Sequence, residues 1–238
     1  MKKTPFFACL LAFMIHFTLC SAQEQIRVKC SNITMTVPSS NVRCYHIDNN
    51  IPLADDAGAA DLENAQIAGT SIVFSDYSSI STEIEPQATF YLVDDMTKTS
   101  FSFLDIAIRM QDDTVNIASG SADIENLYKD SSFMPYQTKE RVINTLPTFL
   151  SFQNGSGIRS IVGFDEQILS SGNTSNLYYS FQGMSSDGQY YISLVLPLMS
   201  VSLNNNNATD VNWTEFDGKD FQPSLDQLDY FVRSIVIE

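Results

Sequence analysis

The sequence predicts an α+β fold, in which an antiparallel β-sheet is covered by a few helices. Residues 149–198 alternate β-branched or aromatic side chains with small polar ones, as strands joined by hairpins do. Near the end of the chain, residues 224–235 carry apolar side chains at helical spacing instead. The expected helices do not alternate regularly with the strands, which argues against a parallel βαβ arrangement.

Residues 1–22 have the composition of a secretory signal peptide. Lys2 and Lys3 precede an apolar stretch, and small residues lie at the expected cleavage site before Gln23. Cleavage there leaves residues 23–238, which we expect to form one α+β domain outside the cytoplasm. Cleavage before Cys20 would instead create a lipid anchor, but the bulky Leu19 fits that motif poorly.

The mature N-terminus is expected to form strands and a disulfide. Ile33, Met35 and Val37 alternate with polar residues, and an extended pattern resumes after Pro38. Cys30 and Cys44 are the cysteines left after signal cleavage, and in an exported chain they are expected to form a structural disulfide. A redox pair is the alternative, although such pairs normally have Cys-x-x-Cys spacing.

The middle of the chain is predicted to mix loops, strands and short helices. Residues 48–70 are acidic and rich in alanine, which indicates a loop with a helical turn over 59–66. Short strands are expected at 71–74 and 88–93, with a turn at Asp94-Asp95. A longer strand is expected at 102–110, because Leu104, Ile106, Ile108 and Met110 alternate. Helices are predicted over 122–129 and 138–145, the second ending before Pro147.

Three strands are expected in the core stretch, over residues 157–164, 176–184 and 189–198. Asp187-Gly188 between the last two tolerates positive φ, which predicts a β-hairpin over 176–198. Because Pro197 lacks a backbone N–H, the last strand should end there or lie at a sheet edge.

The C-terminal region is expected to be a polar excursion followed by a helix. Residues 202–218 are polar and contain Trp213, which is either a stacking platform for a ligand or a lid over the sheet. Ser224 and Gln227 have the spacing of a capping box, and residues 225–235 carry the apolar stripe of a helix. Residues 234–238 are expected to turn into a last strand.

The segments LSFQNGSGIR (150–159) and YYSFQGMSSDGQYYISLVLP (178–197) resemble an uncharacterised bacterial secreted domain family with "FQNGSGxR" and "YxFQGxxxDGxYYVSxxxP" motifs. The resemblance covers most of the mature chain and implies a bacterial, exported protein without an assigned activity. Residues 161–164 depart from the family's pattern of a threonine and an aromatic residue. The ending at 232–237 is similar to Mog1/PsbP-like folds.

Charge and composition argue against several functions. The net charge is −15, which repels phosphate backbones and argues against nucleic-acid binding. His46 is the one histidine after the signal peptide, and no G-x-S-x-G, Walker or Rossmann pattern is present. We therefore expect no cofactor and no metal site, and no transmembrane helix in the mature chain.

Two kinds of candidate site remain. The turn Asn154-Gly155-Ser156-Gly157 could direct backbone N–H groups at an anion that Arg159 clamps, with Trp213 as a further ligand contact. The alternative is a turn into a strand, with Arg159 paired to an acidic neighbour. Asp94-Asp95 and Asp165-Glu166 are the acid pairs that directly follow strands, although such pairs are usually solvated strand ends.

Function can be predicted only as a class. The scarcity of histidine and of metal-binding residues favours an exported, non-catalytic binding or structural module with an unknown protein or surface ligand. The alternative is a carboxylate-dependent hydrolase acting on an envelope or extracellular glycan, which needs two acids across a cleft. A small-molecule carrier is a third reading, and it requires a large apolar cavity.

Overall fold

The structure is a computed structural model. It describes residues 26–37, 41–48, 67–77, 84–99, 101–120, 123–124, 134, 141–164, 177–200 and 212–238. Several expectations lie outside these residues: the signal peptide at 1–22, the helical turn at 59–66, most of the helix at 122–129, the acids Asp165 and Glu166, and the first part of the polar excursion.

The N-terminal strands form a small sheet with the end of the chain. β1 (Ile26–Cys30) and β2 (Ile33–Val37) make an antiparallel hairpin, and Ser31 in its turn has a φ of 57°. β11 (Val236–Ile237) pairs with the other edge of β2. The expected C-terminal strand is therefore present, and it closes a three-stranded sheet in the order β1-β2-β11.

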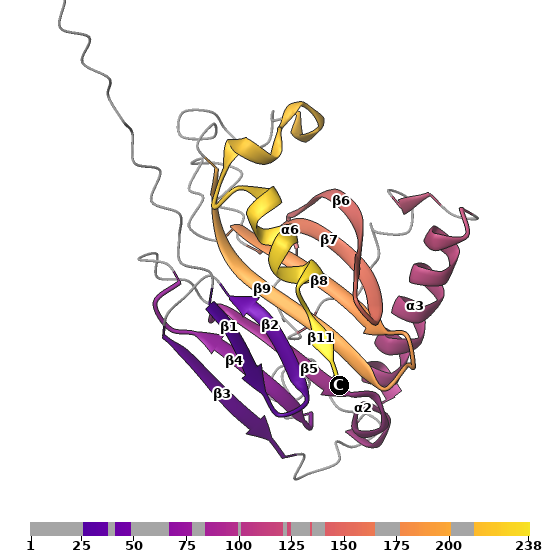
Figure 1. Ribbon diagram of the computed structural model, residues 1–238. Helices are drawn as coiled ribbons and strands as arrows, with labels where there is room; N and C mark the ends of the chain where they lie inside the picture. Colours follow the sequence, from indigo (N-terminus) through magenta and orange to yellow (C-terminus); the bar gives the residue numbers. More distant parts are fainter. Residues whose placement is uncertain are drawn as a thin grey trace, which may run out of the picture.

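The large sheet is antiparallel throughout and has the order β3-β4-β5-β9-β8-β7-β6, with β10 paired to the end of β9 (Figure 1). Its strands are β3 (Val42–Ile47), β4 (Gly69–Phe74), β5 (Gln87–Leu92), β6 (Ile143–Phe152), β7 (Gly155–Gly163), β8 (Leu177–Ser185), β9 (Tyr190–Ser200) and β10 (Phe221–Gln222). Together with the helices below, this confirms the α+β prediction.

The hairpin expected over 176–198 is confirmed as β8 and β9. Gly188 in its turn has a φ of 71°, and the side chain of Asp187 accepts a hydrogen bond from the Gln189 N–H. β9 does not end at Pro197, and it lies inside the sheet. The proline is accommodated because the register of β5 along β9 ends at Val195, whereas that of β10 begins at Met199. Pro197 pairs with Tyr178 of β8 on one side, and on its other side it faces the gap between the β5 and β10 ladders.

Residues 102–110 are helical, which corrects the strand prediction. α2 (Val93–Thr99) follows β5, with Asp94 and Asp95 in its first turn, and α3 (Phe101–Ala118) comes next. The buried residues of α3 repeat at helical spacing: Phe103, Ile106, Ala107, Met110 and Thr114. Ile108, by contrast, is 47% exposed. The alternation of apolar residues was misleading because packing against the sheet buries positions at helical spacing instead.

Residues 143–145 belong to β6, which corrects the helix predicted over 138–145. β6 runs through Pro147 because the register with β7 shifts between Thr145 and Thr148. This bulge places Leu146 at a φ of 53° and removes the proline from regular pairing. Pairing with β7 therefore outweighs the weak helical pattern of the segment.

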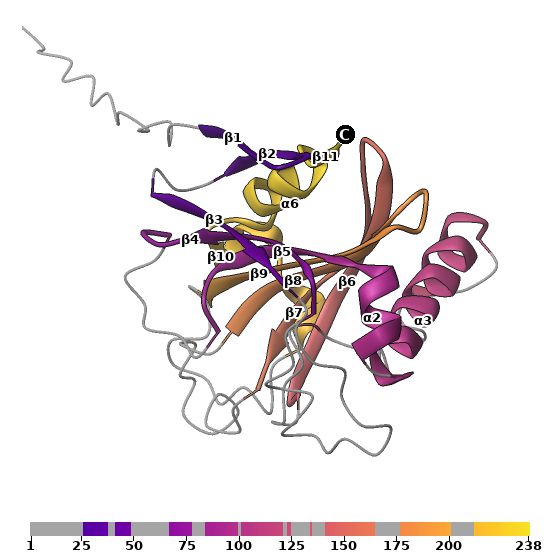
Figure 2. The same ribbon diagram turned by 90° about the horizontal axis from the view of Figure 1, so that it is seen from below.

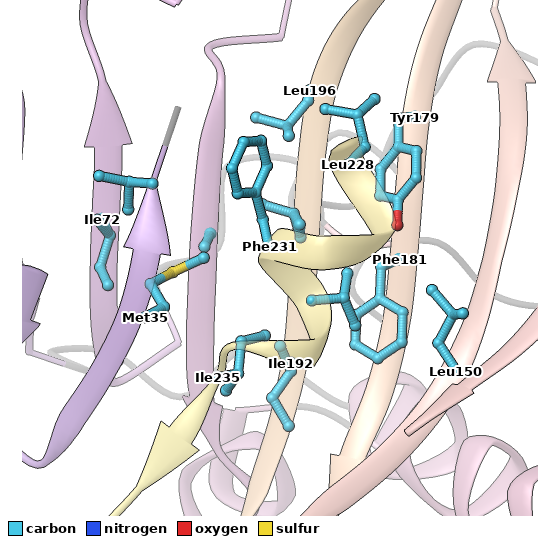
Figure 3. Close-up of a cluster of buried hydrophobic side chains, with 14 of the residues drawn as sticks. Met35, Ile72, Leu150, Tyr179, Phe181, Ile192, Leu196, Leu228, Phe231 and Ile235 are labelled. Atoms are coloured by element: carbon cyan, nitrogen blue, oxygen red, sulfur yellow. The ribbon is translucent and has the colours of Figure 1, made fainter. Parts of the chain in front are cut away.

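The elements pack in layers around the large sheet. α6 (Leu225–Arg233) and the small sheet cover one face, and α2 and α3 lie on the other (Figures 1 and 2). We call these the α6 face and the α3 face. In Figure 3, Leu228 and Phe231 of α6 lie among side chains of β8 and β9, and Met35 of the small sheet joins the same cluster. The capping box of Ser224 and Gln227 begins α6, as the sequence predicted.

Candidate functional site

Arg159 joins three elements beneath α6. It lies on β7, is 7% exposed, and points to the α6 face. Its Nε and Nη2 donate to the two carboxylate oxygens of Asp229 on α6, at 3.2 and 3.4 Å. Its Nη1 donates to the carbonyl of Leu146 at 2.8 Å, within the β6 bulge. The guanidinium therefore pairs with an acid, which is the alternative to the anion clamp that the sequence left open. It also fixes the carbonyl group of the β6 bulge.

Asp229 is enclosed by donors. The hydroxyl of Tyr179 on β8 donates to its Oδ1 at 2.9 Å, and Arg233 lies 3.9 Å from its Oδ2 at the exposed rim. Burial, and then the charge of Asp229, raise the pKa of Tyr179 well above its ordinary value. Because the Arg159 guanidinium and the Tyr179 hydroxyl hold the carboxylate as an acceptor, this cluster is suited to bracing α6 on the sheet.

Asn154 recognises the C-terminal strand. It lies in the turn between β6 and β7, and its Nδ2 donates to the carbonyl of Ile237 at 2.6 Å. Its Oδ1 accepts from the N–H of Ile237 at 3.2 Å. The side-chain amide thus acts like a strand residue on the edge of β11 opposite to β2. Asn154 and Arg159 therefore do not form one site, since Asn154 binds β11 and Arg159 binds α6.

Gln182 makes the same kind of pairing on the α3 face. Its Oε1 accepts from the N–H of Met134 at 3.2 Å, and its Nε2 donates to the Met134 carbonyl at 3.1 Å. Ser193 also donates to that carbonyl, and the hydroxyl of Tyr191 donates to Gln182 at 2.7 Å. A residue distant in sequence is therefore fastened to the centre of the sheet.

A buried polar row surrounds Gln182. Ser71, Thr89, Ser193 and Gln182 lie directly opposite one another on β4, β5, β9 and β8, and all are at most 3% exposed. The hydroxyls of Ser71 and Thr89 are 3.2 Å apart. The sequence does not reveal this row, because polar residues that alternate with apolar ones predict a solvated face. Only the register of the paired strands shows that these polar residues lie opposite one another.

The glycines of segments 150–159 and 178–197 permit close packing. A Cβ atom on Gly157 would lie 2.2 Å from the Gln182 carbonyl oxygen and 2.4 Å from the Cα of Gly183. One on Gly155 would lie 2.1 Å from the ring of Phe152. Phe152 and Phe181 meet edge to face, with their centroids 6.3 Å apart. A Cβ atom on Gly183 would likewise lie 2.8 Å from the ring of Phe181, so in each segment a phenyl ring packs against a glycine that follows it.

The other predicted site residues lie elsewhere. Ser156 pairs with Met184 in the ladder between β7 and β8. Trp213, in η3 (Trp213–Glu215), is half-buried against the core, and its ring centroid is 5.1 Å from that of Phe216. That these residues bind a ligand stays a prediction.

Acidic and histidine side chains were the other catalytic candidates. His46 lies on β3 and contacts Asp48 at 3.3 Å, both exposed. Asp94 and Asp95 lie in the first turn of α2, where their negative charges interact favourably with the positive end of the helix dipole. The pKa of Asp113 on α3 is raised by partial burial and by the charge of Asp112. Among the residues that the structure describes, no cluster of His, Cys, Asp and Glu could hold a metal ion.

The expected disulfide is present. Cys30 at the end of β1 is bonded to Cys44 of β3, with their Cα atoms 5.9 Å apart, and so links the small sheet to the large one. The described part of the chain contains no helix with the length and apolarity needed to cross a bilayer.

Comparison of the chain with protein-family models, with curated proteins and with solved structures finds no significant match.

Proposed function

We propose that this chain is an exported, non-catalytic module that binds a protein or surface partner or stabilises an envelope assembly. One observation carries the proposal: polar side chains of segments 150–159 and 178–197, which resemble the secreted-domain family, are engaged inside the molecule. Asn154 pairs with Ile237, Gln182 with Met134, and Arg159 with Asp229. Signature residues used in this way preserve a rigid shape, which is what a binding or structural module requires.

The disulfide supports the location in this proposal. Such a bond persists in oxidising compartments, in agreement with the signal peptide expected at residues 1–22. A bacterial source and a Mog1/PsbP-like arrangement remain further parts of the proposal. Both rest on the resemblance of the signature segments and of residues 232–237.

Position-specific cross-linking in exporting cells tests the binding role. A photoreactive residue is placed at Ile108, Val115 or Tyr230, which are 47%, 61% and 45% exposed. We expect one discrete cross-linked partner from a subset of these positions, because a binding face covers only part of a surface. Identical cross-linking from all three positions would contradict a defined partner face.

Turnover of a glycan tests the hydrolase alternative. The purified protein is incubated with envelope polysaccharide, and released reducing ends are measured. We expect no release above a heat-denatured control. Release that disappears in Asp165→Asn or Glu166→Gln, but persists in Asp123→Asn, would establish a carboxylate-dependent hydrolase and overturn the proposal.

A further inference from the structure

β3 is the outermost strand of the large sheet. It pairs with β4 on one side, and no described strand pairs with its other side. In Figure 1 it forms the outer margin of the molecule, and the small sheet lies inward of it. The side chains of Arg43, Cys44, Tyr45 and His46 are exposed. Such an edge can accept a further strand.

The direction of the free backbone groups follows from one hydrogen bond. The Ser75 N–H donates to the Asn41 carbonyl at 3.0 Å, which places Asn41 in a hydrogen-bonded pair with the chain of β4. Because such pairs alternate, the backbone groups of Val42, Cys44 and His46 point away from β4. The described residues provide these outward N–H and C=O groups with no hydrogen-bond partner.

The strand is held in place before any partner arrives. The disulfide fixes Cys44 to Cys30. Arg43 donates to the Ser75 hydroxyl at 2.9 Å and contacts Glu85 at 3.1 Å. A preorganised edge loses little conformational freedom when another strand adds to it.

We propose that β3 pairs antiparallel with β3 of a second copy of this chain, with Cys44 opposite the second copy's Cys44. In this register Val42 lies opposite the second copy's His46, and the symmetry repeats that pair. Every residue with outward backbone groups then faces another such residue, so each outward N–H meets a C=O. A register displaced along the strand leaves some of these groups unpaired.

Side chains and charge agree with self-pairing. The register sets Arg43 opposite the second copy's Tyr45, and within one copy the Arg43 guanidinium carbon already lies 5.6 Å from the centroid of the Tyr45 ring. Residues 26–47 contain Arg27, Lys29, Arg43 and no acid, whereas the chain has a net charge of −15, so the remaining residues total −18. Glu238 and Glu85 offset part of this positive charge through ion pairs with Lys29 and Arg43, so the edge carries little net charge and two copies meet there with little like-charge repulsion.

Sedimentation equilibrium of the purified protein tests the proposal. We expect a concentration-dependent dimer. His46→Pro removes one outward N–H in each copy and keeps the bonds to β4, so it should raise the dimer Kd by about tenfold or more. His46→Ala is the matched control, because it removes the same side chain and keeps the N–H. It should leave the Kd within about threefold.

Amide hydrogen exchange of the unmodified protein gives a second readout that needs no substitution. With rising concentration, the amides of Val42, Cys44 and His46 should become protected, while those of Arg43 and Tyr45, which face β4, should not change. A monomer at all concentrations up to about 1 mM overturns the proposal. So does a dimer without protection at these three amides. If His46→Pro fails to fold, Val42→Pro against Val42→Ala removes the opposite member of the same pair.

Discussion

At the scale of single residues, amide and guanidinium groups fasten distant segments to the sheet. Asn154 and Gln182 each offer a donor and an acceptor in the geometry of a peptide group, and each pairs with both backbone groups of one remote residue. Such a pairing satisfies buried or partly buried polar groups that would otherwise lose water without compensation. Packing therefore accounts for these polar side chains in segments 150–159 and 178–197.

Breaking the buried ion pair should strongly destabilise the fold. Asp229→Leu leaves the Arg159 guanidinium without its partner, and we expect a loss of about 3–5 kcal/mol in the free energy of unfolding. The double variant Arg159→Met with Asp229→Leu should lose less than the two single variants together. Urea denaturation measures all three. As control, Arg109→Met removes the exposed pair with Asp105 and should cost at most about 0.5 kcal/mol. Additive losses would contradict the coupling.

The Asn154 clamp can be removed alone. Asn154→Ala leaves both backbone groups of Ile237 without the amide, and we expect a cost of about 2 kcal/mol and faster exchange of the Ile237 amide. Asn212→Ala is the control, since Asn212 bonds to Glu215 at an exposed position. Equal effects of the two substitutions on unfolding would show that the clamp contributes nothing specific.

High pH should destabilise the fold through buried tyrosines. Burial raises the pKa of Tyr91 to about 12, and the pKa of Tyr179 is raised as well. Above pH 10 the unfolded chain releases protons that the folded chain retains, so stability is complete below pH 10 and falls as the pH rises. Each tyrosine contributes a loss of about 1.4 kcal/mol per pH unit. Tyr91→Phe should reduce the slope between pH 10 and 12 by that amount, and an unchanged slope would refute this.

At the scale of elements, the close approach of β7 and β8 depends on glycine. Gly157 and Gly183 lie directly opposite each other, and phenyl rings cover this part of the sheet from the α6 face. The pattern of strands and the position of the hairpin turn were predictable, because alternation and Asp-Gly act locally. The helix α3 was not predictable, since its alternating apolar residues suit a strand until packing against the sheet is considered.

A methyl group at Gly157 should separate the strands. Gly157→Ala places a Cβ within 2.2 Å of the Gln182 carbonyl oxygen, and backbone atoms cannot move aside without breaking the ladder. We expect a loss of about 3 kcal/mol, measured by thermal and urea unfolding. Gly218→Ala is the control, because its nearest neighbour, the Cβ of Leu225, would lie 3.4 Å away. A well-tolerated Gly157→Ala would show that the strands can part freely.

At the scale of the molecule, both ends of the described chain meet in the small sheet. β11 pairs with β2, and Lys29 contacts Glu238. The disulfide then links this sheet to β3. The small sheet and α6 thus cover one face of the large sheet, and the strand pairing of β11 and the disulfide hold this cover in place.

Removal of the disulfide tests the covalent link. Cys30→Ser with Cys44→Ser should lower the free energy of unfolding by about 3 kcal/mol, because the unfolded chain regains the entropy of the open loop. Reduction of the unmodified protein should cause a similar loss, measured by thermal unfolding with and without dithiothreitol. A double variant as stable as the oxidised protein would refute a stabilising role.

The sequence alone determined the strands of the core, their hairpin, the C-terminal helix with its capping box, and the cysteine pair, because these follow from local periodicity, turn chemistry and the small number of cysteines. Only the tertiary structure decided that 102–110 is helical, that β6 passes through Pro147 by a bulge, and that Ser71, Thr89, Ser193 and Gln182 line up inside the protein. It also decided that Arg159 meets Asp229, 70 residues away. Register and long-range packing set these features, and no local pattern in one chain encodes which distant side chain will lie opposite another.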